Sequence, residues 1–241
     1  MRVDVRFSVE GLVEHDLTET TVVVIDVIRA TTCMVEAVAA GARGVYPTAS
    51  TEEAVKLLQS IGRDDTLLCG ERRGVMIEGY DLGNSPSEFR DPRVRDQRLI
   101  MNTTNGTRAF VAAEAADHVF AGSFLNLGAV TVAVADSDRL VVVCAGRSGA
   151  FAMEDALCAG HLVRRLRATG VDPFEVGDGA RAAEALADAF PLSAELLAGT
   201  DAGRLLEEVG LSSDIVDCAR VDVHRVVPEL VDRVLRARHG A

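Results

Sequence analysis

The sequence has no tryptophan, and only two tyrosines and eight phenylalanines among its 241 residues. A folded core must therefore consist mainly of Val, Leu, Ile and Ala. Hydrophobic residues make up 48% and charged residues 26%, a balance that excludes disordered, collagen-like and coiled-coil chains. A chain of this length buries enough surface to fold without a disulfide or a structural metal.

Lysine is nearly absent, because Lys56 is the only one among 25 basic residues. The 37 acidic residues outnumber them and leave a net charge of −12. This charge argues against binding to nucleic acid or to an anionic membrane. It is compatible with a small anionic ligand, because a few arginines inside a cleft can reverse the local field.

The five cysteines, at positions 33, 69, 144, 158 and 218, are scattered and odd in number, which argues against a disulfide framework, and they contain no C-x-x-C pair, which argues against a zinc site of that type. We expect buried free thiols in a reducing cytosol. The N-terminal residues lack the apolar core of a signal peptide. The longest apolar stretch, Ala129–Ala135, is too short to span a bilayer. These features predict a cytoplasmic protein.

Short β-branched runs alternate with Ala-rich helical stretches, and runs such as VVVI and LVVVC are apolar throughout, as in strands buried on both faces. The pattern predicts a layered α/β/α fold with a mostly parallel or mixed sheet. The predicted strands are Val3–Phe7, Thr21–Ile25, Gly44–Pro47, Thr66–Cys69, Leu99–Asn102, His118–Phe120 and Leu140–Cys144. The predicted helices are Thr32–Gly41, Thr51–Ile61, Gly106–Ala115, Leu125–Ala135, Glu154–Ala168, Ala180–Ala189, Asp201–Val209 and Pro228–Arg238.

No linker divides the chain, so we expect one α/β domain over residues 1–241, with a helix-rich C-terminal part from about residue 171. Ser50 predicts a helix N-cap, and Gly62 predicts the end of that helix. The stretch from Gly70 to Gln97 has little periodicity and much Gly, Pro and charge, which is typical of a functional loop.

Polar residues follow three of the predicted strands, at the edge of the sheet where α/β proteins bind ligands. After the first of these strands, Asp26 is a candidate magnesium ligand or acyl-phosphate nucleophile, and the helix that follows offers Arg29, Thr31 and Thr32 to an anion. After the second strand comes a candidate oxyanion cradle built around a glycine: Asn102, Thr103, Thr104, Asn105, Gly106, Thr107 and Arg108.

The third strand leads into a Gly-rich segment with Arg147, and then to the adjacent carboxylates Glu154 and Asp155. The long loop adds further oxygen donors suited to a hard cation, namely Glu71, Asp81 and Asn84. Arginines and carboxylates together predict a pocket that binds a multiply charged anion through Mg²⁺.

Other site types find little support. No G-x-S-x-G elbow surrounds a serine, and no G-x-G-x-x-G opens a dinucleotide fold. Ile28 stands where a haloacid-dehalogenase-type phosphatase carries its second aspartate. For His224 we expect a structural or surface role.

Six segments together resemble the 2-phosphosulfolactate phosphatase family. They are VVVIDVIRATT, GERRGVMIEGYDLGNSPSEF, NTTNGTRA, GSFLN, CAGRSGAFAMEDALCAG and SSDIVDCARVDVHRVVP. The resemblance implies a Mg²⁺-dependent, acid-type phosphatase of coenzyme M biosynthesis, with an α/β fold of its own and a homodimeric assembly. It would release 3-sulfolactate and inorganic phosphate. One departure is Gly199–Arg204, which stands where the family usually carries a Ser-x-His-Gly-type stretch.

The resemblance suggests a hypothesis for the role of each candidate site residue. Asp26 would hold Mg²⁺ with one or more of Glu71, Asp81, Glu154 and Asp155. The catalytic arginines Arg29, Arg108 and Arg147 would bind the anionic groups of the substrate. The substrate-binding residues would be Thr31, Thr32, Asn84, Thr103, Thr104, Asn105, Gly106 and Thr107.

Three questions stay open at this point. Either Asp26 or a metal-bound water molecule attacks phosphorus. The substrate could be another small phosphorylated hydroxy acid. A non-catalytic anion-binding protein on the same scaffold is the alternative from a different class, and the carboxylates argue against it because an anion binder gains nothing from them without a cation.

Overall fold

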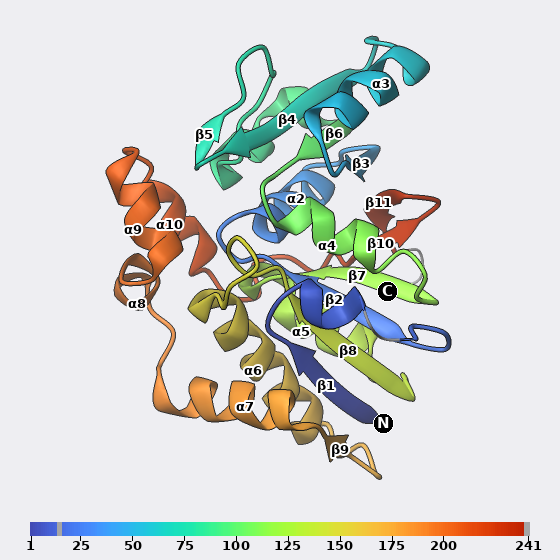
Figure 1. Ribbon diagram of the computed structural model, residues 1–241, viewed down its shortest axis with the longest axis vertical. Coiled ribbons are helices and arrows are strands. Elements are labelled where there is room, and N and C mark those ends of the chain that lie inside the picture. The colour runs from blue at the N-terminus through green and yellow to red at the C-terminus, as the bar shows by residue number, and fades with distance from the viewer. Residues whose placement is uncertain (14–15, 239–241) are drawn as a thin grey trace.

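The computed structural model describes residues 1–13 and 16–238, and the strands in this part of the chain form one mixed sheet with helices on both faces (Figure 1). The predicted α/β class is confirmed. The order across the sheet is β5-β4-β6-β3-β11-β10-β7-β2-β8-β1-β9. The strands are β1 (Arg2–Arg6), β2 (Thr21–Ile25), β3 (Gly44–Pro47), β4 (Thr66–Arg72), β5 (Val75–Met76), β6 (Arg98–Asn102), β7 (His118–Gly122), β8 (Arg139–Cys144), β9 (Glu175–Val176), β10 (Pro228–Val231) and β11 (Val234–Ala237).

The helices cover this sheet, and the described residues also form three short 3-10 turns, two between β5 and β6 and one between β7 and α5. The α-helices are α1 (Glu10–Val13), α2 (Ala30–Ala39), α3 (Thr51–Ile61), α4 (Gly106–Ala112), α5 (Leu127–Ala133), α6 (Met153–Ala168), α7 (Asp178–Ala189), α8 (Ala194–Ala198), α9 (Asp201–Glu208) and α10 (Ser213–Cys218). The 3-10 turns are η1 (Pro86–Arg90), η2 (Pro92–Val94) and η3 (Phe124–Asn126).

Strand β2 is buried on both faces, as its unbroken apolar run predicts. Val23 and Ile25 belong to the core on the side of α5, α6 and α7. Val22 and Val24 belong to the core on the side of α2 and α4. Alternate side chains of one strand thus enter two cores, which is the arrangement of a layered α/β/α fold.

Two parallel groups of strands make up most of the sheet, and an antiparallel hairpin joins them. Strands β4, β6 and β3 form the first group, and β7, β2, β8, β1 and β9 form the second. The β10–β11 hairpin lies between them. It pairs with β3 through Leu235 and Val45, and with β7 through Glu229 and Phe120.

The helix predicted over Pro228–Arg238 is wrong, because this segment forms β10 and β11. Its apolar residues lie at spacings that fit a helix as well as a hairpin. The two residues of the turn, Asp232 and Arg233, have φ of 51° and 63°. Two successive residues with positive φ give the tight turn that matches the twist of a hairpin. Neither residue is a glycine or an asparagine, so the sequence lacked the strong hairpin signal of an Asn-Gly or Asp-Gly pair.

Several local predictions are confirmed. Ser50 caps α3, because its side chain accepts a hydrogen bond from the Glu53 N–H at 3.1 Å, and Gly62 ends this helix with a φ of 85°. All five cysteines are buried free thiols. The segment from Gly70 to Gln97, expected as one long loop, instead contains the end of β4 and also β5, η1 and η2. None of the described helices has the length and apolar character needed to cross a membrane.

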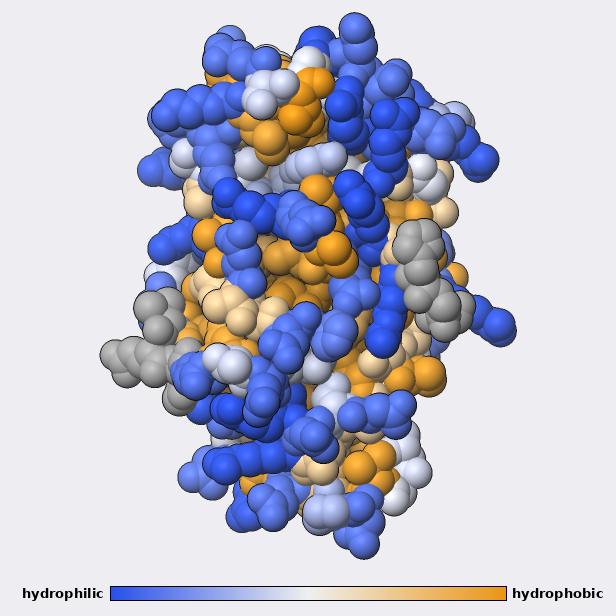
Figure 2. All heavy atoms as spheres, turned by 90° about the vertical axis from the view of Figure 1, so that its right-hand side faces the viewer, coloured by the Kyte–Doolittle hydropathy of each residue, from blue (hydrophilic) through white to orange (hydrophobic). Residues whose placement is uncertain are grey.

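The outer surface mixes polar and apolar side chains. Figure 2 shows the face that lies on the right in Figure 1, where hydrophobic patches are interrupted by charged and polar side chains. The hairpin turn contributes to the exposed apolar surface through Val231, which is 47% exposed. Leu235 on the partner strand is fully buried.

Replacing Leu235 with Ala should therefore lower the free energy of unfolding by about 2–5 kcal/mol, because it leaves a cavity where the hairpin joins the two groups of strands. Val231→Ala, on the exposed side of the same hairpin, should change it by about 0.5 kcal/mol or less. Urea unfolding of the two variants measures the difference. Equal losses would contradict the view that the hairpin is anchored by its buried side.

Candidate active site

A cavity of about 280 Å³ lies where the ends of β2, β4, β6 and β8 approach one another, with α9 covering one side. In Figure 1 these strand ends converge from the upper and lower parts of the sheet. The cavity brings together ten of the predicted site residues. They are Asp26, Arg29, Glu71, Asn84, Thr103, Thr104, Asn105, Arg147, Glu154 and Asp155.

Asp26 directly follows β2, and the turn around it is built to hold its carboxylate. The Asp26 N–H donates to the Thr31 hydroxyl at 2.9 Å, and the Ala30 N–H donates to Asp26 Oδ1 at 3.1 Å. On the other side, a Cβ at position 106 would lie 2.6 Å from Asp26 Oδ2. Only glycine lets the first turn of α4 approach the carboxylate this closely, and this close approach explains why residue 106 is a glycine.

Two further carboxylates connect the loops that form the cavity. Asp155, in the first turn of α6, accepts the Val27 N–H at 2.8 Å and the Gly146 N–H at 3.2 Å. Glu71, near the end of β4, accepts the Gly74 and Thr104 N–H groups, both at 2.8 Å. Each carboxylate therefore joins two loops that are far apart in sequence.

The acidic residues raise one another's pKa because they are buried together. Burial, together with the charges of Glu71 and Glu154, raises the pKa of Asp26 to about 7, although the Ala30 hydrogen bond and the charge of Arg29 oppose this rise. Burial, followed by the charges of Asp26 and Glu154, holds the pKa of Asp155 well above its ordinary value. Burial also raises the pKa of Glu154, which Arg147 partly opposes. Such a group of carboxylates favours a bound proton or a cation.

The donor atoms in the cavity fit a hard cation. Asn84 Oδ1 is buried there without a hydrogen-bond partner among the described residues. Oxygen donors of this kind suit Mg²⁺, which takes one or two carboxylates and completes its shell with water and substrate oxygens. Within residues 1–13 and 16–238, no three Asp, Glu, His or Cys side chains are gathered to hold a metal by themselves. A site closed by protein ligands, as for structural zinc, therefore does not fit.

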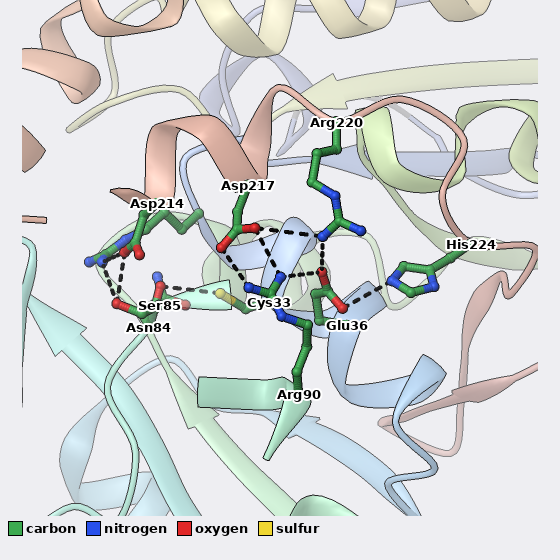
Figure 3. A network of polar contacts seen from close by, with 10 residues as sticks. Cys33, Glu36, Asn84, Ser85, Arg90, Asp214, Asp217, Arg220 and His224 are labelled. Atoms are coloured by element: carbon green, nitrogen blue, oxygen red, sulfur yellow. Dashed lines mark hydrogen bonds and ion pairs between the residues drawn. The ribbon is translucent and has the colours of Figure 1, made fainter. Parts of the chain in front are cut away.

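Arg29 lies almost completely buried beside the cavity. Its Nη1 donates to Asp214 Oδ2 at 2.6 Å, and its Nη2 donates to the Gly74 carbonyl at 2.7 Å. The Ser85 hydroxyl also donates to Asp214 Oδ2, at 2.7 Å. Asp214 and Ser85 face each other in Figure 3. The charge of Arg29 is thus matched by an aspartate from α10, which sequence reasoning missed.

A second ion network holds the same helix α10 against α2 (Figure 3). The buried Glu36 accepts from Arg90 at 2.9 Å and from Arg220 at 3.3 Å, and His224 Nε2 lies 2.9 Å from its other oxygen. Arg90 also pairs with Asp217 on α10 at 2.8 Å. These contacts place His224 in a structural network, as expected.

Some predicted site residues lie outside the cavity. Arg108 is exposed on α4. Asp81 accepts the Leu68 N–H at 2.8 Å and pairs with Arg63 at 2.6 Å, so its carboxylate joins the loop after β5 to β4. Thr31 and Thr32 donate to the Asp26 and Val27 carbonyls. The hydroxyl of Thr107 likewise donates to a backbone carbonyl, that of Thr103. These threonine hydroxyls are used in shaping the turns.

Other cavity residues were not predicted from the sequence. Arg73 and Gly74 come from the turn between β4 and β5, and Ser148 comes from the loop after β8. Ala202 and Leu205 come from α9, within or next to the Gly199–Arg204 departure. The sequence did contain a signal for Arg73 and Gly74, because an Arg-Gly pair that follows a strand can form a two-residue hairpin turn.

Asp214→Asn should lower the free energy of unfolding by about 3–5 kcal/mol, because it leaves the Arg29 guanidinium buried without a counter-charge. Asp217→Asn, on the same helix but in a partly exposed pair, should cost about 1 kcal/mol or less. Urea unfolding at neutral pH compares the two. A loss for Asp214→Asn no larger than that for Asp217→Asn would contradict the buried pairing.

The profile of the family described as 2-phosphosulpholactate phosphatase matches residues 7–233 of this chain. Relatives named "Probable 2-phosphosulfolactate phosphatase" include a Deinococcus radiodurans protein, 40% identical over 212 residues and 86% of each chain. A relative of the same name from Thermotoga petrophila is 38% identical over 216 residues, which are 89% of this chain and 90% of that one. Another, from Caldanaerobacter subterraneus, is 37% identical over 225 residues and 92% of each chain. The chain therefore belongs to the 2-phosphosulfolactate phosphatase family.

Proposed function

We propose that this protein hydrolyses 2-phosphosulfolactate to 3-sulfolactate and inorganic phosphate. The observation that carries the proposal is the polarity of the cavity. Four carboxylates line it and are each less than 10% exposed, namely Asp26, Glu71, Glu154 and Asp155. Its more accessible wall carries arginines, the half-buried Arg147 and the exposed Arg73. A small substrate with a phosphate and other anionic groups matches this arrangement when a cation lies between the phosphate and the carboxylates.

We further propose Mg²⁺ as that cation, with Asp26 and the Asn84 carbonyl oxygen as the groups that would hold it. When bound, Mg²⁺ would act as a Lewis acid that neutralises charge on the phosphoryl oxygens. Glu71 and Asp155 remain candidates at its edge, although their oxygens already accept backbone N–H groups. Asp81 is unsuited, because it faces Arg63.

The chain's own residues would position the substrate and move a proton. Arg147 would bind a phosphoryl oxygen, and the loop of Thr103, Thr104 and Asn105 would orient the phosphate. Glu154, with its raised pKa, would hold a proton for the oxygen that leaves phosphorus. Asp26 would either attack phosphorus or orient an attacking water. Both routes need its carboxylate.

The family resemblance also supports three statements about context, which we propose with the activity. The reaction would serve coenzyme M biosynthesis, the protein would act in the cytoplasm, and two copies would form a homodimer. Light scattering of the purified chain tests the last of these directly.

Phosphate release should be fast with 2-phosphosulfolactate and Mg²⁺, and EDTA should abolish it. Phospholactate and the phosphoglycerates should be poorer substrates, because they lack the sulfonate. A malachite green assay over this panel makes the comparison. Faster release from a phosphoglycerate would assign another phosphorylated hydroxy acid as substrate, and no release from any of them would favour the anion-binding alternative.

Asp26→Asn should abolish phosphate release and yet stabilise the metal-free protein at alkaline pH. The folded-state pKa of about 7 lies above the ordinary 3.8, so folding favours the protonated carboxyl. That contribution is complete below about pH 4 and is lost as the pH rises through 7. At pH 8 in EDTA the variant should therefore gain on the order of 4 kcal/mol at most.

Urea unfolding at pH 4 and pH 8 measures this gain, and it should disappear at the lower pH. Asp188→Asn, an exposed change on α7, serves as the control and should alter neither turnover nor the pH dependence. Wild-type turnover by Asp26→Asn would remove Asp26 from the mechanism.

A further inference from the structure

Arg73 occupies the tip of the β4–β5 hairpin, at the accessible side of the cavity. The hairpin pairs Glu71 with Met76 and Arg72 with Val75, which leaves Arg73 and Gly74 as a two-residue turn. Their φ angles are 52° and 82°, both positive, as such tight turns require. Arg73 lines the cavity, and its neighbour Arg72 does not.

The hairpin tip is fixed from both sides by residues that line the same cavity. Glu71 accepts the Gly74 N–H with one oxygen and the Thr104 N–H with the other. Arg29 donates to the Gly74 carbonyl. Both backbone polar groups of Gly74 are thus engaged, so the backbone next to Arg73 is held in place before any ligand binds.

The charges of the three cavity arginines are compensated differently. Arg29 is paired with Asp214, and Arg147 lowers the pKa of Glu154 through its charge. Like Arg147, Arg73 forms no ion pair within 4.0 Å in the described part of the chain. It is also the most exposed of the three. An uncompensated guanidinium on a fixed turn is suited to a second anionic group of a ligand whose phosphate lies deeper.

We propose that Arg73 binds the sulfonate of the substrate and selects for phosphorylated hydroxy acids that carry a second strong-acid group. This inference rests on the proposed function, in which the carboxylate end of the cavity takes the phosphate with its cation. Arg147 lies beside Glu154 and therefore serves the phosphate. A guanidinium donates two parallel N–H groups to two oxygens of a sulfonate, as it does to a phosphate or carboxylate.

The test is Arg73→Gln assayed with 2-phosphosulfolactate and with 2-phospholactate. The second compound has a methyl group where the first has a sulfomethyl group, so it differs only by the missing sulfonate. We expect kcat/KM for 2-phosphosulfolactate to fall 10- to 100-fold, mainly through KM, as a lost charge-assisted hydrogen bond predicts. For 2-phospholactate it should change less than about threefold. Arg93→Gln, an exposed change on η2 that removes the same charge, should alter neither.

Calorimetric titration with 3-sulfolactate and with lactate gives a second measurement that needs no turnover. If Arg73→Gln weakens the binding of 3-sulfolactate but not that of lactate, the sulfonate site is supported, even when the wild-type protein releases no phosphate. Failure of the proposed reaction can therefore be distinguished from failure of the proposed sulfonate site. Equal losses with 2-phosphosulfolactate and 2-phospholactate would overturn the inference. So would unchanged 3-sulfolactate binding by Arg73→Gln. A folded variant is expected, because Arg73 is exposed and makes no ion pair in residues 1–13 and 16–238.

Discussion

Four carboxylates, those of Asp26, Glu71, Glu154 and Asp155, line one cavity of about 280 Å³, and the loops around it depend on how their charge is accommodated. Burying negative charge is costly unless hydrogen bonds, a proton or a cation compensate it. The negative charges of Asp155 and Glu71 are compensated by hydrogen bonds from backbone N–H groups of loops that are distant from one another in sequence. The same bonds that satisfy these carboxylates therefore fix the shape of the cavity.

Buried charge is also the means by which the C-terminal helices are attached to the site. Asp214 on α10 neutralises Arg29, and Asp217 shares Arg90 with the buried Glu36 of α2. Because removing one partner of such a pair leaves the other charge uncompensated, these contacts tie α10 to the first turn after β2. The segment SSDIVDC, which is part of the family resemblance near the C-terminus, thus contacts the site region through Asp214 and Asp217.

Sequence patterns predicted local structure well where one physical cause dominates. The apolar run of β2 and the Ser50 cap of α3 are confirmed because burial and capping act within a few residues. The Pro228–Arg238 segment was mispredicted because its periodicity fits two structures, and neighbouring strands decided between them. Pairing with β3 and β7 is a long-range interaction, which no local pattern contains.

The same division holds for the site. The sequence by itself determined the α/β class, the candidate site residues Asp26 after a strand, Asn84 in the long loop and Glu154 at a helix start, and the family, because these follow from residue types and their order. Only the tertiary structure decided which of these side chains meet. It places Arg73 at the cavity and leaves Arg108 exposed on α4, and it gives Arg29 a buried partner in Asp214. The physical reason is that the cavity forms between two groups of strands joined by the last hairpin, so its composition depends on contacts between distant segments.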